Sequence, residues 1–200
     1  RPAFFALVLV LFFPVGAGNA GHARQAGNVR PDKGVFLVAK PKASGAFSES
    51  VVLLLAHEEK GTLGVIVNRM TDVSLSELLP DLEWGGKETH RMFFGGPVAL
   101  NGLLFVFRSA RPPEGASHVM GDVYFSAELE VLEKALKRKT SSSALRLFLG
   151  HSGWGPGQLK WELGRGDWEL VRADTETVFE KDPESIWPEL MGPVTRQVAE

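Results

Sequence analysis

The sequence contains no cysteine, and this absence excludes disulfide bonds, thiolate nucleophiles and sulfur-ligated metal sites. A strong charge of either sign is also missing, because 22 Lys and Arg residues stand against 24 Asp and Glu residues, for a formal net charge of −2. A chain with this balance has no positive field that attracts phosphate backbones or anionic headgroups. We therefore expect no nucleic-acid partner.

The familiar catalytic and nucleotide-binding motifs are missing as well. Gly150–Trp154 resembles a nucleophile elbow, but the G-x-S-x-G pattern requires glycine at the position of Trp154. A dinucleotide-binding loop fails at Gln158, which stands where G-x-G-x-x-G needs its last glycine. His57 lacks the second histidine of H-E-x-x-H. We therefore assign no catalytic residue, no metal ligand and no cofactor, and we favour a protein without catalytic activity over an enzyme.

The first residues have the layout of an export signal. An apolar stretch from Ala3 to Phe13 is followed by Pro14 and by small residues up to Ala20. The stretch fits the roughly 7–15 apolar residues of a signal peptide and is shorter than the roughly 20 that span a bilayer. We expect an export segment over 1–20 and no membrane span in the mature chain. The protein is then periplasmic or secreted, and it is cytoplasmic if the segment does not act as a leader.

The rest of the chain has the average composition of one globular domain, with 44% hydrophobic residues. Residues 21–33 have a linker composition, residues 34–192 form the predicted domain, and residues 193–200 form a C-terminal tail. Short apolar or alternating runs predict these strands: Val35–Ala39, Val51–Ala56, Gly64–Asn68, Met92–Phe94, Leu103–Arg108, Val123–Phe125, Leu145–Leu149 and Trp168–Val171.

Helices are expected singly between these strands. The predicted helices are Thr71–Leu79, one that Ser126 caps and that buries Leu129, Leu132 and Leu136, one over Leu159–Leu163, and one opened by Asp182 and Pro183. Glu58–Gly61 predicts a hairpin turn with Gly61 at positive φ, and Gly150–Gly157 predicts a glycine-rich turn. The pattern indicates an α+β domain with a mixed or largely antiparallel sheet and short flanking helices.

Asn68 and Arg69 are the first candidates for a ligand or partner surface. They end a buried strand, where polar side chains become available to a cleft, so Asn68 can orient a ligand and Arg69 can bind an anion. The structural alternative is a turn capped by Asn68 beside a surface Arg69.

The second group of candidates lies on the predicted glycine-rich turn. His151, Ser152, Trp154 and Gln158 supply a titratable ring, a hydroxyl, an aromatic wall and an amide within eight residues. The structural alternative is that Trp154 packs into the core while the glycines make the bend.

Five segments, taken in order, resemble the bacterial AlgH/YqgE family across about Gly34 to Gly192. They are Gly34–Ala39 with Pro41, Val51–His57, Gly61 with Gly64–Arg69, Phe94–Val98, and Gly153–Leu159. The resemblance implies a single α+β domain whose sheet bends into a pseudo-barrel. It implies no established biochemical activity, although family members are described as transcriptional regulators linked to alginate production.

Three functional hypotheses follow. The favoured one is a non-catalytic binding or regulatory module for an unknown protein partner or small ligand. The second is a hydrolase-like enzyme with His57 or His151 as general base, which requires a hydroxyl or acid partner about 3 Å away. Direct DNA binding is disfavoured, because the chain has no helix-turn-helix pattern or basic stripe.

Overall fold

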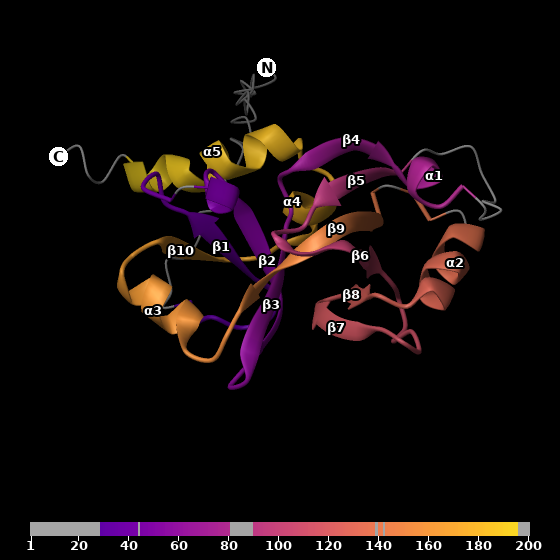
Figure 1. Ribbon diagram of the computed structural model, residues 1–200, viewed down its shortest axis with the longest axis horizontal. Coiled ribbons are helices and arrows are strands. Elements are labelled where there is room, and N and C mark those ends of the chain that lie inside the picture. Colours follow the sequence, from indigo (N-terminus) through magenta and orange to yellow (C-terminus); the bar gives the residue numbers. More distant parts are fainter. Residues whose placement is uncertain (1–28, 44, 81–89, 139, 142, 196–200) are drawn as a thin grey trace, which may run out of the picture.

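The computed structural model describes residues 29–43, 45–80, 90–138, 140–141 and 143–195 (Figure 1). In this part of the chain ten strands form one sheet. The strands are β1 (Val35–Ala39), β2 (Val51–Glu58), β3 (Gly61–Ile66), β4 (Met70–Ser74), β5 (Arg91–Phe94), β6 (Val98–Arg108), β7 (Ser117–Met120), β8 (Val123–Ser126), β9 (Leu145–Trp154) and β10 (Trp168–Arg172). The helices are η1 (Gly45–Phe47), α1 (Leu75–Leu78), α2 (Leu129–Lys137), α3 (Gln158–Gly164), α4 (Thr175–Phe179) and α5 (Pro183–Thr195).

Strand β9 joins the two halves of the sheet. The strand order is β10-β1-β2-β3-β9-β6-β8-β7, with β5 also on β9 and β4 on β5. One edge of β9 pairs with β6, and the other pairs first with β5, in parallel, and then with β3 (Figure 1). The other pairings are antiparallel, which confirms the predicted α+β class with a largely antiparallel sheet. Since the described path ends at β10 and β7, the sheet is open and is not a closed barrel.

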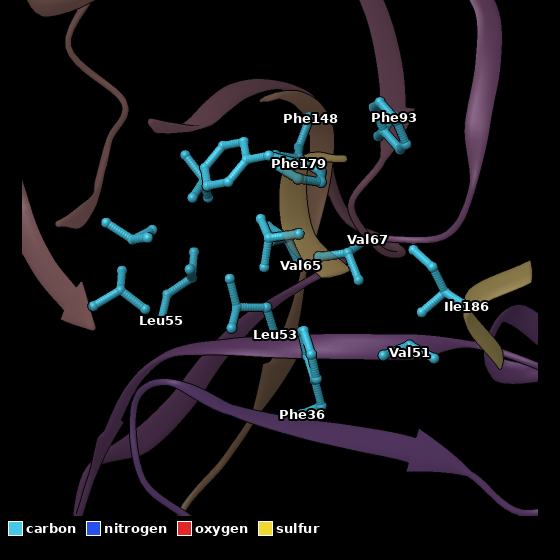
Figure 2. Packing of buried hydrophobic residues seen from close by; sticks show 14 of the residues in the cluster. Phe36, Val51, Leu53, Leu55, Val65, Val67, Phe93, Phe148, Phe179 and Ile186 are labelled. Carbon is cyan, nitrogen blue, oxygen red and sulfur yellow. The ribbon is translucent and has the colours of Figure 1, made fainter. Parts of the chain in front are cut away.

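The buried strands β1 and β2 are covered on both faces, as their continuous apolar runs predict. Phe36 belongs to the largest core cluster, which α4 and α5 cover, whereas its neighbour Leu37 faces a second cluster with Trp154 and Leu159. Figure 2 shows Phe36 and the β2 and β3 side chains of the first cluster close together, with the aromatic side chains of β9 and α4 beyond them. Each run is apolar throughout because neither face meets water.

The predicted helix Thr71–Leu79 is wrong in its first half, which forms strand β4. Met70 pairs with Phe93, and Ser74 pairs with Arg91. The helix begins only after Ser74, whose hydroxyl accepts a hydrogen bond from the Glu77 backbone N–H while the Glu77 carboxylate accepts one from the Ser74 N–H. This capping box fixes the start of the single-turn helix α1.

The predicted cap of the next helix is also wrong. Ser126 ends strand β8, and its hydroxyl donates to the Gly115 carbonyl at 2.7 Å, so α2 begins at Leu129 with Glu128 in the capping position. This shift turns Leu129 toward solvent, with 45% of its surface exposed, whereas Leu132 and Leu136 are buried as predicted.

The glycine-rich turn is the third difference, because β9 continues as a strand through Trp154. Close backbone packing explains the glycines: a Cβ on Gly95 would lie 2.3 Å from the Gly150 carbonyl oxygen, and Gly150 itself has a φ of +67°. The chain turns only after Trp154, before helix α3, which confirms the helix predicted over Leu159–Leu163. The β2–β3 hairpin is confirmed, with Gly61 at a φ of +153°.

The last helix runs past the predicted end of the domain. Helix α5 starts at Pro183 as expected and runs to Thr195, three residues past the predicted boundary at 192. The predicted export segment, residues 21–28 of the predicted linker and the last five residues lie outside the described residues. Among the residues that are described, no helix combines the length and the apolar character needed to cross a membrane.

Candidate functional site

Arg146 interrupts the apolar run of strand β9, and its guanidinium is mostly withdrawn from water. The guanidinium carbon lies 4.5 Å from the centroid of the Phe93 ring, and Nη2 donates to the Phe179 carbonyl oxygen at 3.0 Å. Nε is buried and has no hydrogen-bond partner. Arg146 therefore carries a buried N–H donor that the described protein does not satisfy.

The positive charge of Arg146 also has no ion-pair partner among the described residues. Burial lowers the pKa of the Arg146 guanidinium, because removal from water disfavours the charged form. An arginine stays protonated in proteins, so the site holds a cation that no described carboxylate neutralises.

This guanidinium lines a pocket of about 350 Å³. Its polar lining residues are His90, Arg91 and Arg146. Its apolar lining residues are Met70, Phe93, Leu145, Phe179 and Pro183. The pocket thus lies where β4, β5 and β9 meet α4 and the start of α5, and Figure 1 shows α4 next to β9 and β4.

Local structure holds each wall of the pocket. The parallel pairing of β5 with β9 sets Phe93 opposite Phe148, which places the Phe93 ring beside Arg146. Helix α4 is capped by Asp174, whose carboxylate accepts from the Thr177 N–H at 2.7 Å, and it ends at the buried Phe179. Figure 2 shows Phe93 and Phe179 at the upper edge of the main core cluster.

The two arginines of the pocket differ in their surroundings. Arg91 is about half exposed, and its Nη1 lies 3.4 Å from Oδ1 of the exposed Asp72. Its charge is therefore shared with solvent and a carboxylate. His90 is 7% exposed, and its carbonyl oxygen accepts from the Leu75 N–H at 2.8 Å, which ties the start of β5 to α1.

Asn68 and Arg69 hydrogen-bond to the loop that precedes β2. Asn68 Oδ1 accepts from the Val51 N–H at 2.8 Å, and Nδ2 donates to the Glu49 carbonyl oxygen at 2.9 Å. Arg69 donates to the Ser48 carbonyl oxygen. Glu49 has a φ of +51°, so these hydrogen bonds stabilise a strained residue of the loop before β2.

The second predicted group is organised around a carboxylate that the sequence did not single out. Glu162 Oε2 accepts from the indole N–H groups of Trp154 and Trp168, each at 2.8 Å, and Oε1 accepts from the Gln158 side-chain amide at 3.0 Å. Phe47 stacks against Trp154, with ring centroids 6.0 Å apart. These contacts join α3 to the sheet.

Ser152 hydrogen-bonds to the backbone, and the hydroxyl that lies beside a predicted histidine is Thr62, next to His57. Ser152 is fully buried, and its hydroxyl donates to the Gly95 carbonyl oxygen at 3.0 Å. His57 Nδ1 lies 2.7 Å from Thr62 Oγ1 near the β2–β3 hairpin, and His151 is half-buried opposite Val98. No group of three or more His, Asp or Glu residues suited to a metal ion occurs in the described part of the chain.

The structure therefore brings together residues that the sequence reasoning missed. Of the predicted surface residues, none lines the Arg146 pocket. The available signal was Arg146 itself, a single cation in the apolar run Leu145–Leu149. Its partners Phe93 and Phe179 come from distant segments, so the pattern around Arg146 gave no reason to connect them.

Comparison with known proteins identifies the family. The model of a domain described as AlgH-like matches residues 36–199. A UPF0301 protein of Cytophaga hutchinsonii is 32% identical over 163 residues, covering 80% of this chain and 87% of the relative. A UPF0301 protein of Streptomyces coelicolor is 39% identical over 168 residues, covering 79% of this chain and 84% of the relative.

Two solved structures share the fold. The crystal structure of a Corynebacterium diphtheriae protein has a TM-score of 0.69 at 26% identity, covering 82% of this chain and 88% of the other. The solution structure of AlgH from Pseudomonas aeruginosa has a TM-score of 0.68 at 25% identity, covering 87% and 97%. The family match, the relatives and the shared fold agree, and the chain belongs to the AlgH-like family.

Proposed function

We propose that this protein is a non-catalytic binding module that holds a small anionic ligand in the Arg146 pocket. The single observation that supports this proposal is the buried guanidinium with an unpaired Nε and no ion pair in the described chain. A buried donor without a partner costs about 1–3 kcal/mol, and a charged one costs more. An oxyanion bound in the pocket beside Arg146 would supply the counter-charge for this guanidinium.

The side chain suits this role. The planar guanidinium presents several N–H donors in a fixed arrangement that matches the oxygens of carboxylates and phosphates. Cation–π contact with Phe93 and the hydrogen bond to Phe179 hold the guanidinium in place before a ligand arrives. A site that is already ordered loses less conformational entropy when it binds.

The chemistry of the lining supports binding over catalysis. The described lining residues include no serine, threonine, aspartate or glutamate. The described wall can therefore hold and orient an anion, and it contributes no hydroxyl or carboxylate that could act as a nucleophile.

NMR titration of the Nε–Hε signals tests this proposal directly. The Arg146 signal is assigned as the one absent from an Arg146→Lys variant, and acetate and inorganic phosphate are each titrated into the wild-type protein. We expect at least one of these anions to shift the Arg146 signal saturably. Arg108→Met is the matched control, because Arg108 is exposed and paired with Asp122, so its loss should leave the titration unchanged.

Two outcomes would overturn the proposal. The first is an Arg146 signal that neither anion shifts, or that shifts linearly like those of surface arginines, because the pocket then does not bind anions. The second is chemical conversion of a bound anion, measured by mass spectrometry after incubation, because the module would then be an enzyme.

A further inference from the structure

Resting on the proposed anion site, we infer that the ligand is a small monocarboxylic acid whose carboxylate binds Arg146 and whose body is apolar. The inference concerns the class of ligand and uses two properties of the pocket: its charge balance and the composition of its walls. Both come from the described residues alone.

The charge balance favours a ligand with one negative charge. Arg146 has no ion-pair partner among the described residues, whereas the charge of Arg91 is already balanced by Asp72 and by solvent. A monocarboxylate would cancel the charge of Arg146, which no described carboxylate neutralises. A phosphate with close to two negative charges would bring a surplus into a partly apolar pocket, and burying an uncompensated charge is unfavourable.

The walls favour an apolar body attached to that carboxylate. Five of the eight lining residues are apolar, and three of them, Phe93, Leu145 and Phe179, are almost fully buried. At about 350 Å³ the pocket lies within the usual range of small-molecule sites, about 300–1,000 Å³. It is therefore larger than a carboxylate alone requires, and five apolar side chains contribute to the wall around the remaining space.

Met70 is the wall residue that can be changed with least effect on folding. It lines the pocket and is 51% exposed, so a polar substitution there alters the wall while the buried core stays intact. Leu100 offers a matched control, because it is 55% exposed and is not one of the lining residues. Met70→Ser and Leu100→Ser therefore separate loss of the apolar wall from a general loss of surface hydrophobicity.

The experiment compares four probes on the full chain by calorimetry and by the Arg146 Nε–Hε signal: phenylacetate, acetate, phenylacetamide and inorganic phosphate. Acetate carries the charge without the body, and phenylacetamide carries the body without the charge. We expect phenylacetate to bind about tenfold or more tightly than acetate, since a buried ring adds apolar contact. We expect Met70→Ser to weaken phenylacetate binding severalfold and Leu100→Ser to leave it unchanged.

The outcomes separate this inference from the proposal on which it rests. If phosphate shifts the Arg146 signal at lower concentration than phenylacetate, the inference fails and the proposed anion site stands. If phenylacetamide binds as well as phenylacetate, the inference also fails, because the carboxylate then contributes nothing to binding. Equal affinity of acetate and phenylacetate also overturns it. If neither acetate nor phosphate shifts the Arg146 signal, the proposed function fails, and the inference that rests on it fails with it.

Discussion

Replacing Arg146 with methionine should stabilise the ligand-free protein slightly. The change removes the hydrogen bond to Phe179, which at a charged donor contributes about 1.5–3 kcal/mol, and the cation–π contact with Phe93, which contributes about 0.5–1 kcal/mol. It also removes a mostly buried charge with no ion-pair partner among the described residues, and leaving a buried charge unpaired costs about 3–5 kcal/mol. Methionine has similar length and adapts to irregular apolar space. The balance is a gain of about 1 kcal/mol.

Urea denaturation measures this balance. The free energy of unfolding and the slope against urea are compared for the wild-type protein, Arg146→Met and Arg146→Lys in ligand-free buffer. A rise for Arg146→Met with an unchanged slope agrees with the reasoning. Arg146→Lys should be less stable than both, because it keeps the charge while losing the planar contacts with Phe93 and Phe179. A loss of more than about 2 kcal/mol for Arg146→Met would show that the charge is compensated in the folded protein, and the argument for an anion site would fall.

Three further changes probe other parts of the fold. Gly95→Ala should destabilise the protein by about 3 kcal/mol or more in urea denaturation, because its Cβ would lie 2.3 Å from a backbone oxygen of β9 that has little room to move. Glu162→Gln should cost about 1–3 kcal/mol and change tryptophan fluorescence, because the carboxylate accepts from two indoles. For Asp167, hydrogen bonding from Arg165 lowers the pKa of the carboxyl, so its stabilising effect is present above the ordinary value and is lost as pH falls toward the lowered one. Asp167→Asn should therefore be less stable than wild type at neutral pH, and the difference should vanish in acid.

The controls for these changes come from open or exposed positions. Gly164→Ala adds a methyl group at a site with no atom within 4 Å, so it should leave stability unchanged, in contrast to Gly95→Ala. Glu133→Gln removes an exposed carboxylate whose partner lies 3.5 Å away, and it should leave tryptophan fluorescence unchanged. The predictions would be contradicted if Gly95→Ala and Gly164→Ala changed stability equally, or if Glu162→Gln and Glu133→Gln changed tryptophan fluorescence equally. They would also be contradicted if the stability difference between Asp167→Asn and the wild type stayed constant down to low pH.

Much of the fold follows from the sequence because burial leaves a strong local signal. The runs Val35–Ala39 and Val51–Leu55 are fully buried in the structure, and continuous apolar residues are typical of strands covered on both faces. The structure of the segment Met70–Leu78 was harder to predict, because Val73, Leu75 and Leu78 have the spacing of an amphipathic helix. Pairing with β5 makes its first half a strand, and that partner lies beyond the segment itself.

The candidate site was harder to predict from the sequence, because its geometry depends on distant parts of the chain. Asn68 was predicted at the end of a strand and Trp154 on a glycine-rich turn, and in the structure the side-chain hydrogen bonds of both go to the protein itself. Arg146 acquires its character only when β5 and α4 are placed against β9. The local sequence pattern shows which residues are apolar. It does not show which distant groups will surround a cation in the folded protein.

The arrangement of the sheet also sets the order in which the chain can fold during synthesis. Strand β1 pairs on one side with β2, which emerges from the ribosome soon after it, and on the other side with β10, so that Val35 lies opposite Arg172. The strand β9 that links the halves is likewise made late, at residues 145–154. Such distant pairings slow folding, because the intervening loop must close before they form. The nascent chain therefore carries an exposed apolar strand edge until most of the protein has been translated, and protection from aggregation during that interval must come from outside the domain.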